Sequence, residues 1–347
     1  MVQRKRRSRT VAEVGERALI ERLGALQAPE PLWVRVGRGA DDCAALDLGG
    51  RDWTLVTCDA QVEGTHFRRD WIDPRTLGRR AASVNLSDIA AMGGEPRAAV
   101  VSLLLPRSLE LRFYDALMRG LSKQLEAHGA ALVGGNLARS RRNITVDVTL
   151  LGRVRPERCV RRSGARIGDR VLVTGSPGES GAGLVRLQRG ARRRDRLLRR
   201  FLDPEPRVQA GGILGAAGVT AMIDVSDGLA PDLIQLCGAS NVGARLDAAC
   251  LPVSTLLRNA ARRLEKSSLD LVLYGGEDYE LLCTAPARRV ATLQRRLRRS
   301  TNLQLTEIGE IRPAIEGVCL QSDDGMVPLQ QRGFEHFGSR PPRSATS

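Results

Sequence analysis

Short apolar segments that end at acidic or glycine-rich turns recur along this chain and set the strongest limit on its fold. Such segments are typical of buried strands. The three clearest cover residues 53–57, 131–133 and 221–223, and they lead into Cys58-Asp59, Gly134-Gly135-Asn136 and Asp224-Val-Ser-Asp-Gly228. A chain built this way places polar side chains at the ends of several buried strands.

Segments with helical spacing lie between these strands. The spacing of apolar residues predicts helices over residues 11–26, 76–92 and 109–128. Strands and helices follow one another without strict alternation. This order favours an α+β protein with mixed sheets.

The length of 347 residues predicts two domains, because single domains usually hold about 100–200 residues. We expect an N-terminal domain over residues 11–153 and a C-terminal α+β domain over residues 154–338. A disordered basic tail at 1–10 and a loose tail at 339–347 are expected to flank them.

The charge of the chain is strongly positive, at +15, because 54 lysines and arginines face 39 acidic residues. Only three of the 54 are lysines, and aromatic residues make up 3%. This composition suits solvated helix faces and tails better than a nucleic-acid surface, which uses aromatic rings to stack bases. We therefore expect no nucleic-acid partner, although a basic nucleic-acid binder stays open as an alternative.

The apolar segments and cysteines point to a cytoplasmic protein. No segment approaches the roughly 18–20 apolar residues of a membrane span, and no secretory signal is expected. The seven cysteines are odd in number and form no Cys-x-x-Cys pair, which favours a reducing compartment over a disulfide framework.

Acidic residues at predicted strand ends and on one predicted helix are the main candidates for chemistry. Any one of them alone is usually a cap or a turn. Together, with only three histidines in the chain, they favour Mg²⁺, which prefers oxygen ligands. The candidates are Asp41, Asp42, Asp59, Asp88, Asp224, Asp227, Glu277 and Asp278.

Three other features are weaker. The glycine-rich segment at 175–183 precedes a predicted helix and is either a phosphate-binding loop or only a turn. Asn85 and Asp88 are three residues apart on a predicted helix, so both can face one site. His66 follows Asp59 closely and is either a structural or a site residue. No serine, histidine and aspartate triad is indicated.

The chain resembles the thiamine-monophosphate kinase family, within the aminoimidazole ribonucleotide synthetase-like superfamily. The similarity runs in order from about residue 37 to 337. The motifs that carry it are Asp59-Ala-Gln-Val-Glu-Gly-Thr-His-Phe67, Ala82-Ser-Val-Asn-Leu-Ser-Asp-Ile-Ala-Ala-Met-Gly93, Arg162-Ser-Gly-Ala-Arg-Ile-Gly-Asp169, Asp224-Val-Ser-Asp-Gly-Leu229, Gly275-Gly-Glu-Asp-Tyr-Glu-Leu281 and Gly333-Phe-Glu-His-Phe337.

The resemblance implies a fold, two substrates and a set of site residues. It implies an N-terminal half that dimerises through its sheet, a sandwich-like C-terminal half, ATP, several Mg²⁺ ions, and thiamine monophosphate as acceptor. The positions that it implies for Mg²⁺ are Asp42, Thr57, Cys58, Asp59, Asp88, Asn136, Asp224 and Asp227. Those implied for ATP are Gly135, Asn136, Arg162 and Ser226, and those for the thiamine substrate are His66, Glu277 and Phe334.

The chain departs from the family pattern at four positions. Asn136 replaces an aspartate, Cys58 replaces a threonine, Ala40 replaces a glycine and Phe334 replaces a tyrosine. The first two bear on how many Mg²⁺ ions the protein holds.

The expected reaction is direct in-line phosphoryl transfer from ATP, which depends on positioning and on neutralising charge. A phosphate acceptor is largely dianionic at pH 7, because its second pKa is about 6, so no general base is needed. The alternatives are another ATP-using enzyme of the superfamily, such as an amidine-forming synthetase, or a catalytically impaired homologue with a binding or regulatory role.

Overall fold

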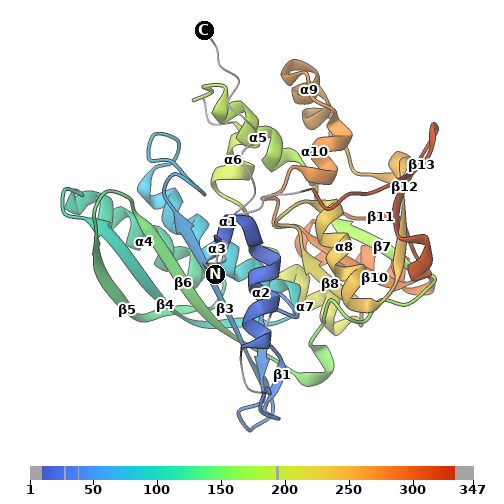
Figure 1. Cartoon of the computed structure of the whole chain (residues 1–347), viewed down its shortest axis with the longest axis horizontal. Helices are drawn as coiled ribbons and strands as arrows, with labels where there is room; N and C mark the ends of the chain where they lie inside the picture. The colour runs from blue at the N-terminus through green and yellow to red at the C-terminus, as the bar shows by residue number, and fades with distance from the viewer. Residues whose placement is uncertain (1–9, 27–28, 38, 193–194, 333–347) are drawn as a thin grey trace, which may run out of the picture.

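The computed structural model describes residues 10–26, 29–37, 39–192 and 195–332. The tails expected at 1–10 and 339–347, apart from residue 10, lie outside the described residues, and so does Phe334. Within them, two mixed sheets with their own helices form two halves packed side by side (Figure 1). This α+β arrangement confirms the expected fold class.

The first sheet has the strand order β1-β2-β3-β6-β4-β5 among the described residues. Neighbouring strands are antiparallel except for β4 and β5, which are parallel. The strands are β1 (Val34–Val36), β2 (Ala44–Leu46), β3 (Trp53–Val62), β4 (Glu95–Pro106), β5 (Ala131–Ser140) and β6 (Thr145–Val154). On β6, the buried Val146, Val148 and Leu150 alternate with half-buried residues, so one face of the sheet carries the core.

Helices α3 (Pro74–Ala91) and α4 (Leu111–Ala127) supply the apolar side chains that this core packs against. Gly78 of α3 lets the two helices touch, because a Cβ there would lie 2.1 Å from the carbonyl oxygen of Leu117. Helix α3 begins at Pro74 with the side chain of Asp73 capping the nitrogen of Thr76, and it is buried along most of its length.

The second sheet has the order β13-β12-β9-β11-β7-β10-β8. Of these neighbouring pairs in the described part of the chain, β12 and β9 are parallel and the others are antiparallel. The strands are β7 (Asp169–Thr174), β8 (Ala221–Asp224), β9 (Gly243–Asp247), β10 (Leu281–Pro286), β11 (Leu305–Arg312), β12 (Val318–Ser322) and β13 (Gly325–Pro328).

Helices cover both faces of this second sheet. Val171 and Val173 of β7 join one apolar cluster, while Leu172 between them joins another, so the strand is buried on both sides. Helices that contribute to the first cluster are α5 (Glu179–Gln188), α6 (Arg196–Leu202), α8 (Leu229–Ser240), α9 (Thr255–Leu264) and α10 (Ser268–Tyr274). Helices α7 (Val208–Ala216) and α11 (Val290–Thr301) contribute to the other.

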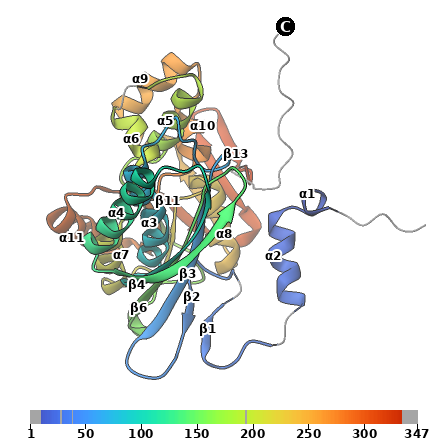
Figure 2. The ribbon, with the colours of Figure 1, turned by 90° about the vertical axis from the view of Figure 1, so that its left-hand side faces the viewer.

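The remaining elements are short. Helices α1 (Val11–Val14) and α2 (Glu16–Ala25) stand away from the body of the protein (Figure 2). The described residues also form four single turns of 3-10 helix: Pro156–Arg158, Ala248–Cys250, Ala287–Arg289 and Ala314–Glu316. Among the described residues, no helix is both long enough and apolar enough to cross a membrane.

Three differences from the sequence predictions have physical causes. The helix predicted over 11–26 is broken at Gly15, which has a φ of 81°. The strand predicted to end at residue 133 continues to Ser140, because β5 pairs with β4 through the glycines. The composition predicts solvated arginine faces on helices, and the arginines of α11 do line an exposed face above the buried Leu293 and Leu297. On α6, however, Arg196 and Arg200 form ion pairs with the buried Glu179.

Candidate active site

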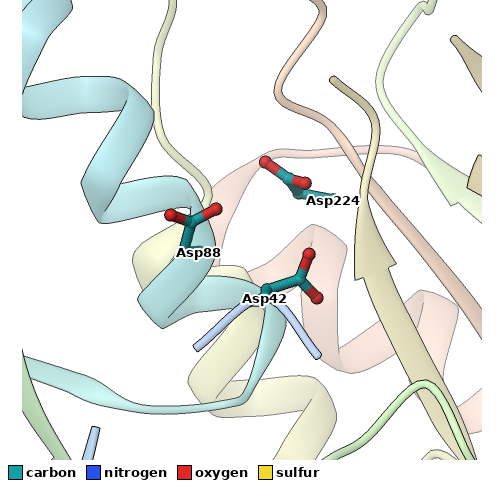
Figure 3. Close-up of side chains that lie close together, drawn as sticks. All are labelled: Asp42, Asp88 and Asp224. Carbon is teal, nitrogen blue, oxygen red and sulfur yellow. The ribbon is translucent and has the colours of Figure 1, made fainter. Parts of the chain in front are cut away.

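Three carboxylates from three separate elements meet where the two halves join. One oxygen each of Asp42, Asp88 and Asp224 lies within 4.8 Å of the others (Figure 3). The first half supplies Asp42, just before β2, and Asp88, on α3. The second half supplies Asp224, the last residue of β8. The site therefore exists only when the halves are packed together.

Hydroxyl groups orient two of these carboxylates. Thr57 on β3 donates a hydrogen bond of 2.5 Å to Asp88. Ser87 on α3 donates one of 2.6 Å to Asp224, across the boundary between the halves. Both hydroxyls and Asp224 are buried, so these bonds form away from bulk water and fix the carboxylates firmly.

Arg162 holds the third carboxylate. Its guanidinium lies 2.6 Å from Asp42, and its backbone N–H donates to Asp41 at 3.0 Å. The guanidinium also donates to Gln235 at 3.2 Å. Arg162 is thus the cation next to the cluster, and its planar group suits a phosphate or a carboxylate.

Burial, and repulsion between neighbouring carboxylates, make the ionised forms of this cluster unfavourable. Burial, with the nearby Asp42 charge, raises the pKa of Asp224 from 3.8 to about 8, although Ser87 and Arg162 oppose the shift. Burial, with the charges of Asp59 and Asp224, raises the pKa of Asp88 well above its usual range. Burial also raises the pKa of Asp42, against the pull of Arg162. Burial and the Asp42 charge raise the pKa of Asp41 to about 7.

A bound cation would relieve this repulsion. The Oδ2 atom of Asp42 is buried and has no hydrogen-bond partner among the described residues. Carboxylate oxygens are the ligands that Mg²⁺ prefers, and the three carboxylates converge on one point. The donor set of Asp42, Asp88 and Asp224 therefore fits Mg²⁺.

Asn85 and Asp88, three residues apart on α3, serve the same region, as predicted. The side-chain oxygen of Asn85 accepts a hydrogen bond of 3.1 Å from the backbone N–H of Asp59 on β3. The charge of Asp59 helps to raise the pKa of both Asp88 and Asp224, so Asp59 lies near the cluster.

The turn after β8 is held by a buried carboxylate. The Oδ2 atom of Asp232 accepts hydrogen bonds from the backbone N–H groups of Ser226, Asp227 and Gly228, at 3.0–3.2 Å. Asp232 lies in the first turn of α8, so its carboxylate joins this turn to the start of that helix. The turn carrying Ser226 and Asp227 therefore has a fixed position beside Asp224.

Cys58 and Asn136 lie on the other face of the first sheet from Thr57 and Asp88. The Cys58 thiol donates to Asp147 on β6 at 3.0 Å. Asn136 on β5 is opposite Ser102, which is opposite Asp147, and residues in register point to the same face. Asn136 and Gly135 are exposed. A Cβ at Gly135 would lie 2.0 Å from the Val101 carbonyl oxygen, so only glycine fits there.

The residues predicted to hold the thiamine substrate come from two loops. His66 follows β3, and its Nδ1 accepts a hydrogen bond of 3.0 Å from the Val62 N–H. Glu277 has a left-handed backbone with a φ of 60°. Its N–H donates to the Ser226 carbonyl at 2.6 Å, which joins it to the turn after β8.

Backbone N–H groups of the glycine-rich segment at 175–183 are already bound by a carboxylate of the protein. The carboxylate of Asp278 accepts hydrogen bonds from the backbone N–H groups of Gly178, at 2.8 Å, and Ser180, at 3.3 Å. These N–H groups are the ones that a phosphate would use at the start of α5. The structure thus favours a turn over a phosphate loop.

A cavity of about 300 Å³ opens elsewhere, beside the start of α3. None of the candidate site residues lines it. Its lining consists of Arg69, Asp70, Trp71, Ile72, Asp73, Leu187, Arg192, Leu198 and Leu202.

Sequence reasoning did not single out Ser87, Arg80, Asp232 or Tyr279. Ser87 lies inside a motif that we quoted, and its position next to Asp88 was the only signal. No local sequence pattern marks Arg80 as a site residue, because its partner Glu277 is 197 residues away in the sequence.

Two family descriptions match most of the described chain. Residues 40–154 match the AIR synthase related protein, N-terminal domain, and residues 166–318 match the AIR synthase related protein, C-terminal domain. The relatives agree. The thiamine-monophosphate kinase of Escherichia coli (strain K12) is 37% identical over 331 residues, covering 94% of this chain and 99% of that protein.

A second relative and a solved structure extend the comparison. The thiamine-monophosphate kinase of Mycobacterium tuberculosis is 38% identical over 276 residues, covering 79% of this chain and 82% of that protein. The structure of AaThiL complexed with AMPPCP and TMP superimposes with a TM-score of 0.83 at 32% identity, covering 95% of this chain and all of that one.

Proposed function

The chain belongs to the thiamine-monophosphate kinase family, and we propose that it transfers the terminal phosphoryl group of ATP to thiamine monophosphate, producing thiamine diphosphate and ADP. The observation that carries this proposal is the meeting of Asp42, Asp88 and Asp224 at the junction of the halves. A relative of the same fold was solved with AMPPCP and TMP, an ATP analogue and the proposed acceptor.

The three carboxylates would hold Mg²⁺, and bound Mg²⁺ would neutralise charge on the phosphates of the two substrates. Several ions are proposed, with Thr57, Asp59 and Asp227 next to the three carboxylates. Cys58 and Asn136 are proposed for a further ion on the other face of the sheet, where the carboxylate of Asp147 contacts the Cys58 thiol. Arg162, Ser226, Gly135 and Asn136 are proposed for ATP.

The reaction needs no basic side chain. An oxygen of the acceptor phosphate forms the new bond to the γ-phosphorus, while the bond from that phosphorus to the bridging oxygen of ATP breaks and ADP leaves. Because the acceptor phosphate is already largely dianionic at pH 7, the protein has only to align the two groups and exclude water. His66, Glu277 and Phe334 are proposed to hold the thiamine part of the acceptor.

We also propose that the protein is a homodimer that pairs through its first sheet. Val133 and Leu137 on the edge strand β5 are 65% and 64% exposed, which is unusual for large apolar side chains. Analytical ultracentrifugation of the wild type and of Leu137→Arg tests this. A monomeric wild type would contradict the proposal.

A cytoplasmic location is proposed because all seven cysteines are free thiols.

An acceptor panel tests the proposed function. Purified protein with ATP and Mg²⁺ is offered thiamine monophosphate, unphosphorylated thiamine and the amide substrate of an amidine-forming synthetase, and ADP release is measured. We expect turnover with thiamine monophosphate alone. Turnover only with the amide would assign the chain to another reaction of the superfamily, and no turnover would favour an impaired homologue.

A further inference from the structure

Arg80 is a fully buried cation in the middle of the molecule. It lies on α3 with a side chain only 1% exposed. Its Nε donates to the Gln61 side chain at 2.9 Å, and one terminal nitrogen donates to the Phe201 carbonyl. The guanidinium also lies over the Phe201 ring, 4.7 Å from its centre. The last terminal nitrogen forms an ion pair with Glu277 in the other half.

Glu277 is held by two groups through the same oxygen. Its Oε2 accepts from Arg80 and from the Tyr279 hydroxyl, the latter at 3.1 Å. Its Oε1 has no hydrogen-bond partner among the described residues. Because the side chain is 24% exposed, Oε1 is the part of this carboxylate that a ligand can reach.

Helix α3 ties Glu277 to the carboxylate cluster. Arg80 and Ser87 are seven residues apart, so they face the same side of the helix. Ser87 holds Asp224, and Arg80 holds Glu277. The backbone of Glu277 is also joined to Ser226, two residues after Asp224. One rigid helix therefore sets the distance between Glu277 and the place where phosphoryl transfer would occur.

We propose that Arg80 is a positioning residue for Glu277, fixing its Oε2 so that Oε1 faces the cationic ring system of the acceptor. This inference rests on the proposed function. Thiamine monophosphate carries a thiazolium cation and an amino group, both of which suit a carboxylate oxygen. Without Arg80, the carboxylate of Glu277 would keep only the Tyr279 hydroxyl and would rotate more freely.

Variants at Arg80 give the direct test. Arg80→Met keeps the long apolar stem and removes the charge, so the KM for thiamine monophosphate should rise by about 10-fold or more, as for loss of a charge-assisted hydrogen bond. The KM for ATP should change by less than about two-fold, because the loss of binding falls on one substrate. Arg80→Lys keeps the charge without the planar group and should recover part of the loss. Calorimetric binding of thiamine monophosphate should weaken in parallel.

The neighbouring Arg79 provides a matched control. It also joins α3 to the second half, through two hydrogen bonds of 2.9 Å and 2.5 Å to Asp203, but it does not contact Glu277. Arg79→Met should leave both KM values unchanged. Should Arg80→Met fail to fold, Tyr279→Phe removes the other contact to Oε2 and should raise the KM for thiamine monophosphate alone.

Three outcomes would overturn the inference. The first is an equal rise of both KM values in Arg80→Met, which would show a merely structural role. The second is an unchanged KM for thiamine monophosphate in Arg80→Met or, where that variant does not fold, in Tyr279→Phe. These two leave the proposed function in place. The third, a wild type that does not phosphorylate thiamine monophosphate, overturns the inference and the proposed function together.

Discussion

The Ser87 hydroxyl on α3 donates a 2.6 Å hydrogen bond to the carboxylate of Asp224 at the end of β8, across the boundary between the two halves. This bond lowers the pKa of a carboxyl that burial raises. It therefore favours the ionised form, which is the form that binds a cation. The Ser87 hydroxyl thus links the packing of the two halves to the affinity of the site for a cation.

The first prediction removes that hydroxyl. Ser87→Ala should increase the Mg²⁺ concentration needed for half-maximal rate by about 5-fold, since one hydrogen bond contributes about 1 kcal/mol. Steady-state rates over a Mg²⁺ titration measure this. Ser83→Ala is the control, because Ser83 is equally buried on α3 but bonds Gln124. A shift of the same size in both variants would contradict a specific role for Ser87.

The second prediction concerns the carboxylates themselves. Asp224→Asn and Asp59→Asn should each lower kcat by at least about 100-fold, because the charge that holds the cation is lost. Circular dichroism should be unchanged, and Asp224→Asn should not lower the melting temperature, since burial already makes the charged form of this carboxyl unfavourable. Asp323→Asn, at an exposed turn, serves as the control. Near-normal turnover in either test variant would remove that residue from the site.

The third prediction is a pH dependence of stability without metal. In the folded protein, Asp224 and Asp278 keep a proton up to about pH 8, whereas in the unfolded chain they lose it near 3.8. The folded state therefore binds more protons between these values, and the free energy of unfolding must fall as pH rises. Thermal unfolding in EDTA from pH 6 to 8 should show a falling melting temperature.

Added Mg²⁺ should reverse that trend. The cation competes with protons for the cluster, so its stabilising effect should be largest at the highest pH. Asp224→Asn should reduce the pH dependence in EDTA, and the part that Asp278 contributes should remain. A melting temperature that rises steadily from pH 6 to 8 without metal would show that the carboxyls are ionised in the folded protein.

The fourth prediction tests the packing of α3 against α7. A Cβ on Gly211 would lie 2.0 Å from the Ala90 carbonyl oxygen, so Gly211→Ala should destabilise the protein by about 2 kcal/mol or more. The adjacent Gly212 has nothing within 4 Å of that position. Gly212→Ala should be neutral or stabilising by up to about 1 kcal/mol. Chemical denaturation of both variants measures the free energy of unfolding. Equal changes in the two variants would contradict close packing at Gly211.

The fifth prediction concerns Asn136. Because an amide offers one neutral oxygen where a carboxylate offers two and a charge, Asn136→Asp should shift the Mg²⁺ dependence of the rate to lower concentration. Titrations at fixed ATP measure this. Superimposable curves would mean that Asn136 is not a metal position. An inactive wild type that Asn136→Asp restores would favour the impaired-homologue alternative.

Local patterns were enough to predict the three carboxylates of the cluster. Asp224 ends a four-residue buried strand, and Asp88 lies in a motif on a helix, so short-range signals mark both. The mixed sheets also followed from the order of strands and helices. These features depend on residues close together in the sequence.

The groups that orient the cluster depend on contacts between distant residues. Ser87 and Asp224 are 137 positions apart, and Arg80 and Glu277 are 197 apart, so neither pair leaves a local pattern. The continuation of β5 through Gly134 and Gly135 was also missed. Glycine is a poor strand former, but pairing with β4 compensates for that preference.

The most direct test of the account is ³¹P NMR of wild-type protein with ATP, Mg²⁺ and thiamine monophosphate. We predict that the γ-phosphate signal of ATP falls while two coupled signals of thiamine diphosphate and those of ADP rise in equal amounts, and that Asp224→Asn shows none of these changes. Release of inorganic phosphate without thiamine diphosphate, or equal product from Asp224→Asn, would contradict the claim that this carboxylate cluster directs phosphoryl transfer to thiamine monophosphate.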